Sequence, residues 1–270
     1  MNGEIRQAIV PCGGLGKRLD ALRWGRPKEM LSLAGKPLVR RVVEEALRGG
    51  ARLVAVVVRP GKEEIVRYLS SPSVREELRV DREGRSILFV VQEEPTGLAD
   101  AIALAWRGME AEPSALLLPD NIYDGNGLAE ILPAYLETRR STAGLLSLDE
   151  SEWGGFGNCG GVRTEPEGSV LRVVSLGSKG KGPFRGEPGG GRTLRWYGRV
   201  ILTPRFLTLM ESVRFPPGGE RDDVPVLQAL VEDEGVAGVP LRERGFDVGN
   251  PEGLARAEAY FGRGEAEGGR

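Results

Sequence analysis

The amino-acid sequence predicts an α/β protein in which a mostly parallel sheet is sandwiched by helices. First, strand-length apolar runs alternate with segments of helical periodicity through the first half of the chain, an order typical of parallel sheets. Second, residues 53–58 (LVAVVV) are all apolar, as expected of a strand covered on both faces. Third, 40% of the 270 residues are hydrophobic and 28% are charged, which is ordinary for a globular protein with a substantial core.

The elements of the first half follow from apolar spacing and from the residues at their ends. In the segment 37–48, for example, Leu38, Val42 and Leu47 share one face of a helix, and Gly49 ends it. The predicted strands are Ile5–Pro11, Leu53–Val58, Ser86–Gln92, Ala115–Leu118 and Ala143–Leu148. The predicted helices are Pro37–Arg48, Gly61–Leu69, Leu98–Met109 and Gly127–Arg139.

The pattern changes after Asp149, where residues 149–203 predict a β-rich insertion. Residues 177–192 are rich in Gly, Lys, Arg and Pro, which indicates a long mobile loop that is either a functional lid or a linker. The elements predicted from here on are strands at Ser169–Leu176 and Leu194–Leu202 and helices from Pro204, at Val224–Val231 and at Pro251–Phe261. We expect one domain over residues 1–262 and a flexible tail over 263–270.

Composition excludes several classes of function. The 37 basic and 39 acidic residues nearly cancel, so the chain lacks the basic footprint of a nucleic-acid binder. No apolar run approaches the ~20 residues that span a membrane, and the N-terminus lacks the layout of a signal peptide. Two cysteines, Cys12 and Cys159, do not make a disulfide framework, so we expect a cytoplasmic protein.

The absence of histidine restricts the chemistry further. A chain with no histidine cannot form a Ser-His-Asp or Cys-His nucleophile system. It cannot form a His-bearing zinc site either, and two cysteines are too few for an all-Cys site. Carboxylates, Lys, Arg, backbone amides and a hard metal ion remain, and these groups suit phosphate chemistry.

The strongest local signal follows the first predicted strand, in the segment 11–19 (PCGGLGKRL). Gly13, Gly14 and Gly16 let backbone N–H groups approach an anion closely, and a loop that follows a strand in this fold class lies at the ligand-binding edge of the sheet. Arg18 can add a bidentate contact to phosphate oxygens. The alternative is a tight turn that merely tolerates glycine.

Two common phosphate-binding patterns do not fit this loop. The Walker A pattern requires Gly and Ser or Thr where Pro11 and Arg18 stand, and the dinucleotide fingerprint requires Gly where Leu19 stands. Lys28, which follows Pro27 ten residues beyond Arg18, could reach the same phosphate.

Together, the stretch from Gly13 to Leu31 resembles the G-x-G-x-R-L … P-K-x-L/M pattern of the sugar-1-phosphate nucleotidyltransferases. The form Pro27-Lys28-Glu29-Met30-Leu31 is most similar to the bacterial UTP–glucose-1-phosphate uridylyltransferases. The resemblance implies a Rossmann-like fold with a β-rich insertion on the sugar side. It spans most of the chain, because further matches follow in the expected order.

One such match is residues 92–101, which resemble the family's base-reading segment. By this resemblance, the side chain of Gln92 and the backbone of Gly97 face a pyrimidine. An amide can pair with the donor–acceptor edge of uracil or thymine, so UTP and dTTP both stay open. Outside this context, a Pro/Gly turn before an amphipathic helix would explain the segment equally well.

Asp120 and Asp247 resemble the two aspartates that share a magnesium ion in the family. Asp120 follows a buried apolar run, and Asp247 lies in the segment Gly245 to Gly249. Two carboxylates with substrate phosphates form a normal Mg²⁺ shell. Taken singly, each is more often a loop or capping residue. Asp223 and the segment 224–230 also resemble a helix of the family.

The sugar-side segment departs from the family pattern. The family carries a Glu-Lys-Pro triplet where this chain reads VSLGSK over 174–179, so the Glu that holds sugar hydroxyls has no counterpart. By the resemblance, Lys179 or Lys181 takes the place of the Lys that holds the sugar phosphate in the family, and a solvated loop charge is the ordinary alternative. Gly161 resembles the family's sugar-contacting turn, from which the Tyr is missing.

The implied reaction joins a pyrimidine nucleoside triphosphate to a sugar-1-phosphate, with glucose-1-phosphate as the expected acceptor, and releases pyrophosphate. In it Arg18 would neutralise the β- and γ-phosphates and Lys28 the reacting α-phosphate. Three alternatives are a Rossmann-type oxidoreductase, a transferase for another sugar phosphate and a non-catalytic relative. An oxidoreductase would need an acidic residue at the end of the second predicted strand, where this chain has Arg59 and Pro60. No nucleic acid or membrane partner is expected, and a homo-oligomer is compatible with the sequence.

Overall fold

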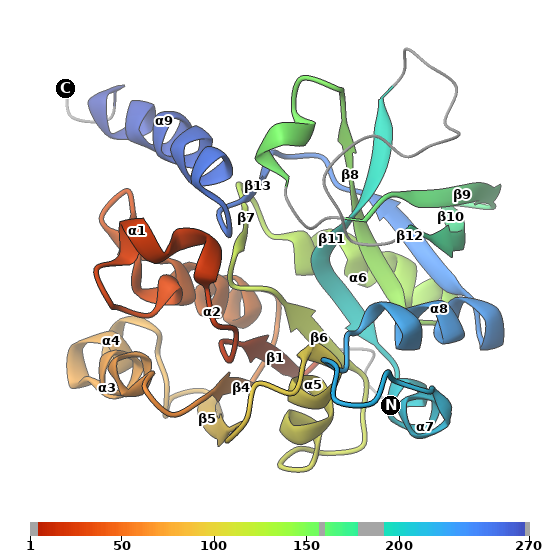
Figure 1. Ribbon diagram of the computed structural model, residues 1–270, viewed down its shortest axis with the longest axis horizontal. Coiled ribbons are helices and arrows are strands. Elements are labelled where there is room, and N and C mark those ends of the chain that lie inside the picture. Colours follow the sequence, from red (N-terminus) through yellow and green to blue (C-terminus); the bar gives the residue numbers. More distant parts are fainter. Residues whose placement is uncertain (1–4, 157–159, 178–191, 268–270) are drawn as a thin grey trace.

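A computed structural model of the protein describes residues 5–156, 160–177 and 192–267. Its centre is a nine-stranded sheet with the order β5-β4-β1-β6-β11-β8-β12-β10-β9, which is the predicted α/β architecture (Figure 1). The strands of this sheet are β1 (Gln7–Pro11), β4 (Leu53–Val58), β5 (Ser86–Val91), β6 (Ser114–Leu117), β8 (Thr142–Leu148), β9 (Val162–Glu167), β10 (Val170–Leu176), β11 (Thr193–Leu202) and β12 (Val236–Pro240).

Most strands of the sheet run in one direction. β5, β4, β1 and β6 pair in parallel, as do β8 and β12. β11 is antiparallel to both of its neighbours, β6 and β8, and β10 is antiparallel to β12 and β9. Only β11 and β10 therefore oppose the other strands of this sheet. Of the strands in the predicted β-rich stretch, β9 and β10 extend the main sheet at one edge. β11 lies inside the sheet, between β6 and β8.

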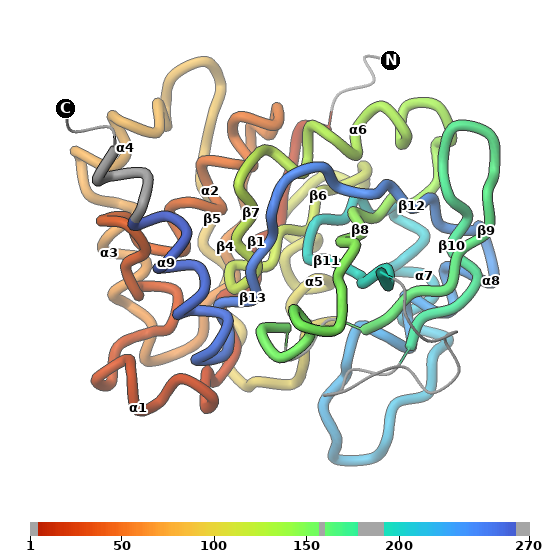
Figure 2. The backbone as a smooth tube through the Cα atoms, turned by 90° about the horizontal axis from the view of Figure 1, so that it is seen from above, coloured from red at the N-terminus to blue at the C-terminus, as the bar shows by residue number. Residues whose placement is uncertain are grey.

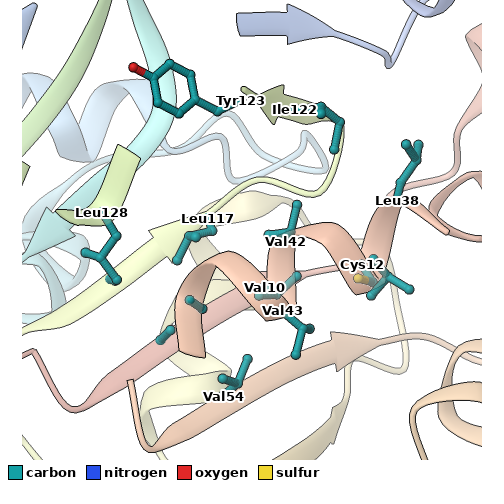
Figure 3. Packing of buried hydrophobic residues seen from close by; sticks show 14 of the residues in the cluster. Val10, Cys12, Leu38, Val42, Val43, Val54, Leu117, Ile122, Tyr123 and Leu128 are labelled. Atoms are coloured by element: carbon teal, nitrogen blue, oxygen red, sulfur yellow. The ribbon is translucent and has the colours of Figure 1, made fainter. Parts of the chain in front are cut away.

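Side chains alternate between the two faces of the sheet along each strand, and helices cover both faces. Ala8, Val10, Val54 and Val56 pack with α2 (Leu38–Arg48) and α6 (Gly127–Thr138) on one face, and Figure 3 shows part of this packing. Ile9 and the remaining alternate positions pack with α5 (Leu98–Trp106), α7 (Arg205–Ser212) and α8 (Val224–Asp233) on the other. The predicted helices thus form the two outer layers.

Several short elements were not predicted from the sequence. They are η1 (Lys17–Leu19), α1 (Asp20–Arg23), η2 (Lys28–Met30), β2 (Ser32–Leu33), β3 (Lys36–Pro37), α4 (Pro72–Glu77), β7 (Asn121–Tyr123), η3 (Trp153–Gly155) and β13 (Gly245–Asp247), besides β9 and β12. α3 (Glu63–Ser70) begins two residues later than expected. The missed strands are short or contain Gly and Pro, so their apolar periodicity is weak.

The C-terminal helix α9 (Pro251–Glu267) continues beyond the predicted end at Phe261. It returns to the N-terminal part of the molecule (Figure 2), where Phe261 packs under the guanidinium of Arg41 at 5.0 Å. No helix among the described ranges is long and apolar enough to cross a membrane.

Candidate active site

A cavity of about 420 Å³ opens at the carboxyl ends of β1, β5 and β6. Because these strands are parallel, the segments that follow them meet at one edge of the sheet. The Gly loop follows β1, Gln92 follows β5, and Asp120 lies just past β6. The β7–β13 pair adds Asp247, which lies opposite Asn121 in its register.

The predicted site residues within the described part of the chain all line this one cavity. They are Gly13, Gly14, Gly16, Arg18, Lys28, Gln92, Gly97, Asp120, Gly161 and Asp247. Lys179 and the alternative Lys181 lie outside the described residues. The structure therefore gathers residues that are up to 234 positions apart in the sequence (Gly13 to Asp247).

The Gly loop is shaped by two close approaches. Gly16 has a φ of 69° at the start of η1, a conformation that favours glycine, and a Cβ at this position would lie 3.4 Å from the side chain of Lys28. A Cβ at Gly13 would lie 2.7 Å from Oε1 of Gln92. Both glycines thus allow functional side chains to lie against the loop backbone.

A buried ion pair lies behind the loop. Nζ of Lys62 donates to both carboxylate oxygens of Glu29, at 2.9 and 2.8 Å, and to the carbonyl of Cys12. Lys62 and Glu29 are almost completely buried. The pair joins the Gly loop to the segment that carries Lys28. Burial raises the pKa of the neighbouring Cys12 thiol well above its ordinary value, so this cysteine is a packing residue rather than a nucleophile.

Lys28 forms an ion pair with Asp120, with 2.5 Å between Nζ and Oδ2. Burial would lower the pKa of Lys28, but Asp120 and Glu29 outweigh it and raise that pKa. Burial would likewise raise the pKa of Asp120, but Lys28 and then Arg18 hold it below its ordinary value. Both groups are therefore charged at neutral pH.

Gly249 marks the point where the two aspartates meet. A Cβ at Gly249 would lie 2.9 Å from Oδ2 of Asp120, 2.9 Å from Oδ1 of Asp247 and 3.2 Å from a guanidinium nitrogen of Arg18. Because each of these two carboxylate oxygens lies 2.9 Å from the same Cβ position, their separation cannot exceed the sum of the two distances. Both are hard oxygen donors, which Mg²⁺ prefers. The described residues contain no group of three or more His, Cys, Asp or Glu that could hold a metal, so phosphate oxygens would have to complete a shell here.

Gln92 and Gly97 lie together between the end of β5 and the start of α5, and both line the cavity. Nε2 of Gln92 donates to the carbonyl of Gly97 at 3.1 Å and to Oγ1 of Thr96 at 3.2 Å. The φ of Gly97 is 125°, and a Cβ there would overlap the backbone of Arg221. The amide side chain of Gln92 is thus oriented by the turn that precedes α5.

The lining of the cavity also includes several glycines and apolar side chains. Gly161 forms a bridge with Arg195 and accepts a hydrogen bond from the N–H of Gly177 at 2.9 Å. Sequence reasoning did not single out Leu118, Asn121, Leu176, Trp196 and Glu220, which also line the cavity. Trp196 falls within a predicted strand, where an aromatic residue is ordinary, so the sequence carried no signal for its place in a cavity.

The fold and the cavity define an α/β protein in which a glycine loop, two basic residues and two carboxylates line one cavity. A sequence model of the nucleotidyl transferase family matches residues 7–261, and the chain belongs to this family. The predicted family is thereby confirmed.

Similar proteins were found by sequence and by structure. The chain is 28% identical to the UTP–glucose-1-phosphate uridylyltransferase of Mycoplasma genitalium, over 96% of this chain and 92% of the relative. It is 27% identical to the enzyme of that name from Bacillus subtilis, over 96% and 91%. A UDP-glucose pyrophosphorylase complexed with UDP-glucose has a TM-score of 0.81 at 23% identity, covering 96% of this chain and 99% of that one. A UTP-bound UGPase from Acinetobacter baumannii has a TM-score of 0.78 at 22% identity, covering 96% and 93%.

Proposed function

We propose that this protein transfers a uridylyl group from UTP to glucose-1-phosphate and releases pyrophosphate. The observation that carries the proposal is the convergence of Arg18, Lys28, Asp120 and Asp247 on one cavity beside the Gly loop. Family membership supports nucleotidyl transfer. The names of the relatives support UTP and glucose-1-phosphate as the substrates.

In this reaction an oxygen of the sugar phosphate attacks the α-phosphorus of UTP. The new bond joins that oxygen to the α-phosphorus, and the bond between the α-phosphorus and the bridging oxygen to the β-phosphate breaks, so pyrophosphate leaves. The second pKa of a phosphate monoester is ~6, so the nucleophile is already ionised at neutral pH. No general base is needed, in accord with a chain that has no histidine.

The main obstacle is repulsion between two anions, which positioning and positive charge overcome. Backbone N–H groups of Gly13, Gly14 and Gly16 would cradle the triphosphate. Arg18 would neutralise the β- and γ-phosphates, and Lys28 would hold the α-phosphate. The ion pair with Asp120 keeps the ammonium of Lys28 at the cavity, which reduces the reorganisation required when the phosphates bind.

We propose Mg²⁺ as the cofactor, held by Asp120 and Asp247. The support is the approach of both carboxylates to the same point beside Gly249. A bound Mg²⁺ would neutralise charge on the phosphates of the two substrates. In the structure Oδ2 of Asp120 binds Nζ of Lys28, and Oδ1 of Asp247 accepts a hydrogen bond from the N–H of Gly249 at 2.9 Å.

On the nucleotide side, Gln92 and Gly97 would read the pyrimidine edge. On the sugar side, Gly161 and Lys179 are proposed to contact the sugar phosphate. We also propose that residues 1–262 form a single domain, since the central sheet draws strands from both halves of the chain. The cytoplasm is the proposed location, based on cysteine usage.

A magnesium-dependent pyrophosphate-release assay tests the function. We expect release with UTP and glucose-1-phosphate, and less with dTTP, ATP, galactose-1-phosphate or N-acetylglucosamine-1-phosphate. Preference for another acceptor would correct the sugar assignment. Binding of UDP-glucose in calorimetry without pyrophosphate release from any substrate pair would instead identify a non-catalytic relative.

A further inference from the structure

Arg199 on β11 is a large, fully buried side chain whose five N–H groups all have acceptors. Nε and Nη2 donate to Oε1 and Oε2 of Glu45 at 2.8 and 2.7 Å. Nη2 also donates to the carbonyl of Asn121 at 2.7 Å. Nη1 donates to the carbonyls of Leu118 and Gly198 at 3.3 and 2.8 Å. Since a guanidinium has five donors in a rigid fork, the geometry of this group is fully determined.

Two of these acceptors flank Asp120 in the chain. The carbonyls of Leu118 and Asn121 begin and end the turn between β6 and β7, and the guanidinium binds both. Pro119 in the same turn has no N–H group to donate. The carbonyl of Asp120 accepts a hydrogen bond from the N–H of Val248 at 2.8 Å, which links this turn to the segment carrying Asp247. The turn that Arg199 binds thus carries Asp120 and is hydrogen-bonded to the segment that carries Asp247.

Arg199 does not line the cavity that contains Asp120. It lines a separate cavity of about 430 Å³, together with Glu45 and Tyr123. The side chain therefore cannot touch a substrate bound at the candidate active site, and any effect on the reaction must pass through the turn.

Glu45 on α2 holds the guanidinium from the other side. Its Oε1 also accepts a hydrogen bond from the N–H of Gly127 at 2.9 Å, at the start of α6. A buried Arg–Glu pair is weak evidence for stability, because well-packed apolar side chains of similar volume are often as stable. Apolar side chains, however, cannot replace the hydrogen bonds that Arg199 donates to backbone carbonyls.

We propose that Arg199, oriented by Glu45, is a positioning residue that holds the β6–β7 turn so that the carboxylate of Asp120 faces Lys28 and Asp247. The inference rests on the proposed function, in which Asp120 and Asp247 act together on the phosphates. It adds residues outside the substrate cavity to the determinants of the reaction rate.

The double variant R199M/E45M separates positioning from stability. Arg199→Met alone leaves a buried carboxylate unpaired and should lower the melting temperature. The double variant removes both charges, so its melting temperature should return toward that of the wild type. Its kcat should remain about 10- to 100-fold below that of the wild type, and the Mg²⁺ concentration that gives the half-maximal rate should rise about tenfold. Losses of this size are typical when a residue that orients a metal ligand is replaced. KM for UTP should change little, since Gln92 and the Gly loop are untouched.

Hydrogen exchange provides a readout that does not depend on activity. The N–H of Asn121 bonds to the carbonyl of Leu118 at 3.2 Å within the turn. In R199M/E45M we expect faster exchange of the peptide covering this turn, with unchanged exchange in β4. Arg199→Lys, which keeps the charge but loses the fork, should recover part of kcat. If the double variant does not fold, Glu45→Gln provides the same exchange and Mg²⁺ measurements.

Glu234→Gln is the matched control. Glu234 accepts hydrogen bonds from Ser141 and Thr203, so its loss should lower stability and leave kcat unchanged. A double variant with wild-type kcat and wild-type exchange in the turn would overturn the positioning role. A wild-type protein that releases no pyrophosphate would contradict the proposed function alone, because the exchange measurement still tests the hold on the turn.

Discussion

At the scale of single residues, the Lys28–Asp120 ion pair is the electrostatic centre of the candidate site. Its two members come from the segments after β1 and β6, and both stay charged despite burial. The same aspartate approaches Asp247 and Arg18 around Gly249. One carboxylate thus contacts a lysine and faces a second carboxylate, an arrangement suited to organising phosphates and a divalent cation.

Asp120→Asn should lower kcat by on the order of 10²–10³, the usual cost of losing an electrostatic stabiliser. The amide keeps the shape of the side chain, so the fold should persist. Steady-state kinetics and thermal melting test this. Asp233→Asn is the matched control, because Asp233 pairs with Arg205 at the surface and such pairs contribute little. Near-normal pyrophosphate release by Asp120→Asn would refute the assigned role.

Gly249→Ala should lower kcat because its new methyl group would lie 2.9 Å from an oxygen of each aspartate. These carboxylates must move apart, and a misplacement of about 1 Å can reduce a rate by about 10². Steady-state kinetics across a range of Mg²⁺ concentrations should show the lower kcat even when Mg²⁺ is saturating. Gly262→Ala is the control, since a Cβ there meets nothing within 4 Å. Equal rates for both variants would show that the close approach at Gly249 is unimportant.

At the scale of elements, the junction at the start of α5 joins the turn of Thr96 and Gly97 to a segment far along the chain. The N–H of Arg221 donates to the carbonyl of Thr96 at 2.6 Å, and the N–H of Ala99 donates to the carbonyl of Arg221 at 3.1 Å. This packing leaves no room for a side chain at Gly97. The element boundary therefore depends on one glycine.

Gly97→Ala should lower the free energy of unfolding by roughly 1–3 kcal/mol, because a strained φ and a backbone overlap combine. It should also raise KM for UTP more than KM for glucose-1-phosphate, because Gln92 would lose its contact with residue 97. Ala103→Gly within the same helix should cost about 1 kcal/mol and leave both KM values unchanged. Denaturant unfolding and steady-state kinetics distinguish the two, and an unchanged KM for UTP in Gly97→Ala would contradict the base-side role.

At the scale of the whole molecule, acid stability should follow the carboxylates that are paired in the folded state. Burial would raise the pKa of Glu44, but hydrogen bonds from Lys36 and Arg40 outweigh it and lower that pKa. A hydrogen bond from Arg205 lowers the pKa of Asp233. A carboxyl group whose pKa is lowered by folding binds more protons in the unfolded chain than in the folded protein. Its contribution to stability is therefore present above the unfolded-state pKa and is lost as the pH falls through the folded-state pKa.

We therefore expect a melting temperature that is nearly constant from about pH 8 to about pH 5.5 and falls below about pH 4, where model carboxylates titrate. The absence of histidine removes the group that ordinarily titrates near neutrality. Thermal melts across this range provide the test. A loss of stability concentrated between about pH 7 and about pH 5.5 would show that this account of the ionisable groups is wrong.

The longer helices and strands, the family, and the glycine, basic and acidic residues of the cavity could be predicted from the sequence. Apolar spacing was sufficient for α2 and β4, because these elements bury a periodic face or a whole strand. The residues of the Gly loop, with Lys28 and Asp120, were predictable because their types and order carry phosphate chemistry. β7, β12 and β13 were missed, since short pairings depend on partners far along the chain.

Which distant groups touch one another follows from the tertiary structure alone. The placement of β11 between β6 and β8, the contact of Lys28 with Asp120 and the hold of Arg199 on the Asp120 turn have no local sequence signature. Parallel strands bring their carboxyl ends to one edge of the sheet, so side chains that are tens or hundreds of positions apart in the sequence meet there. A buried arginine on a strand shows its role only when the five acceptors around it are known.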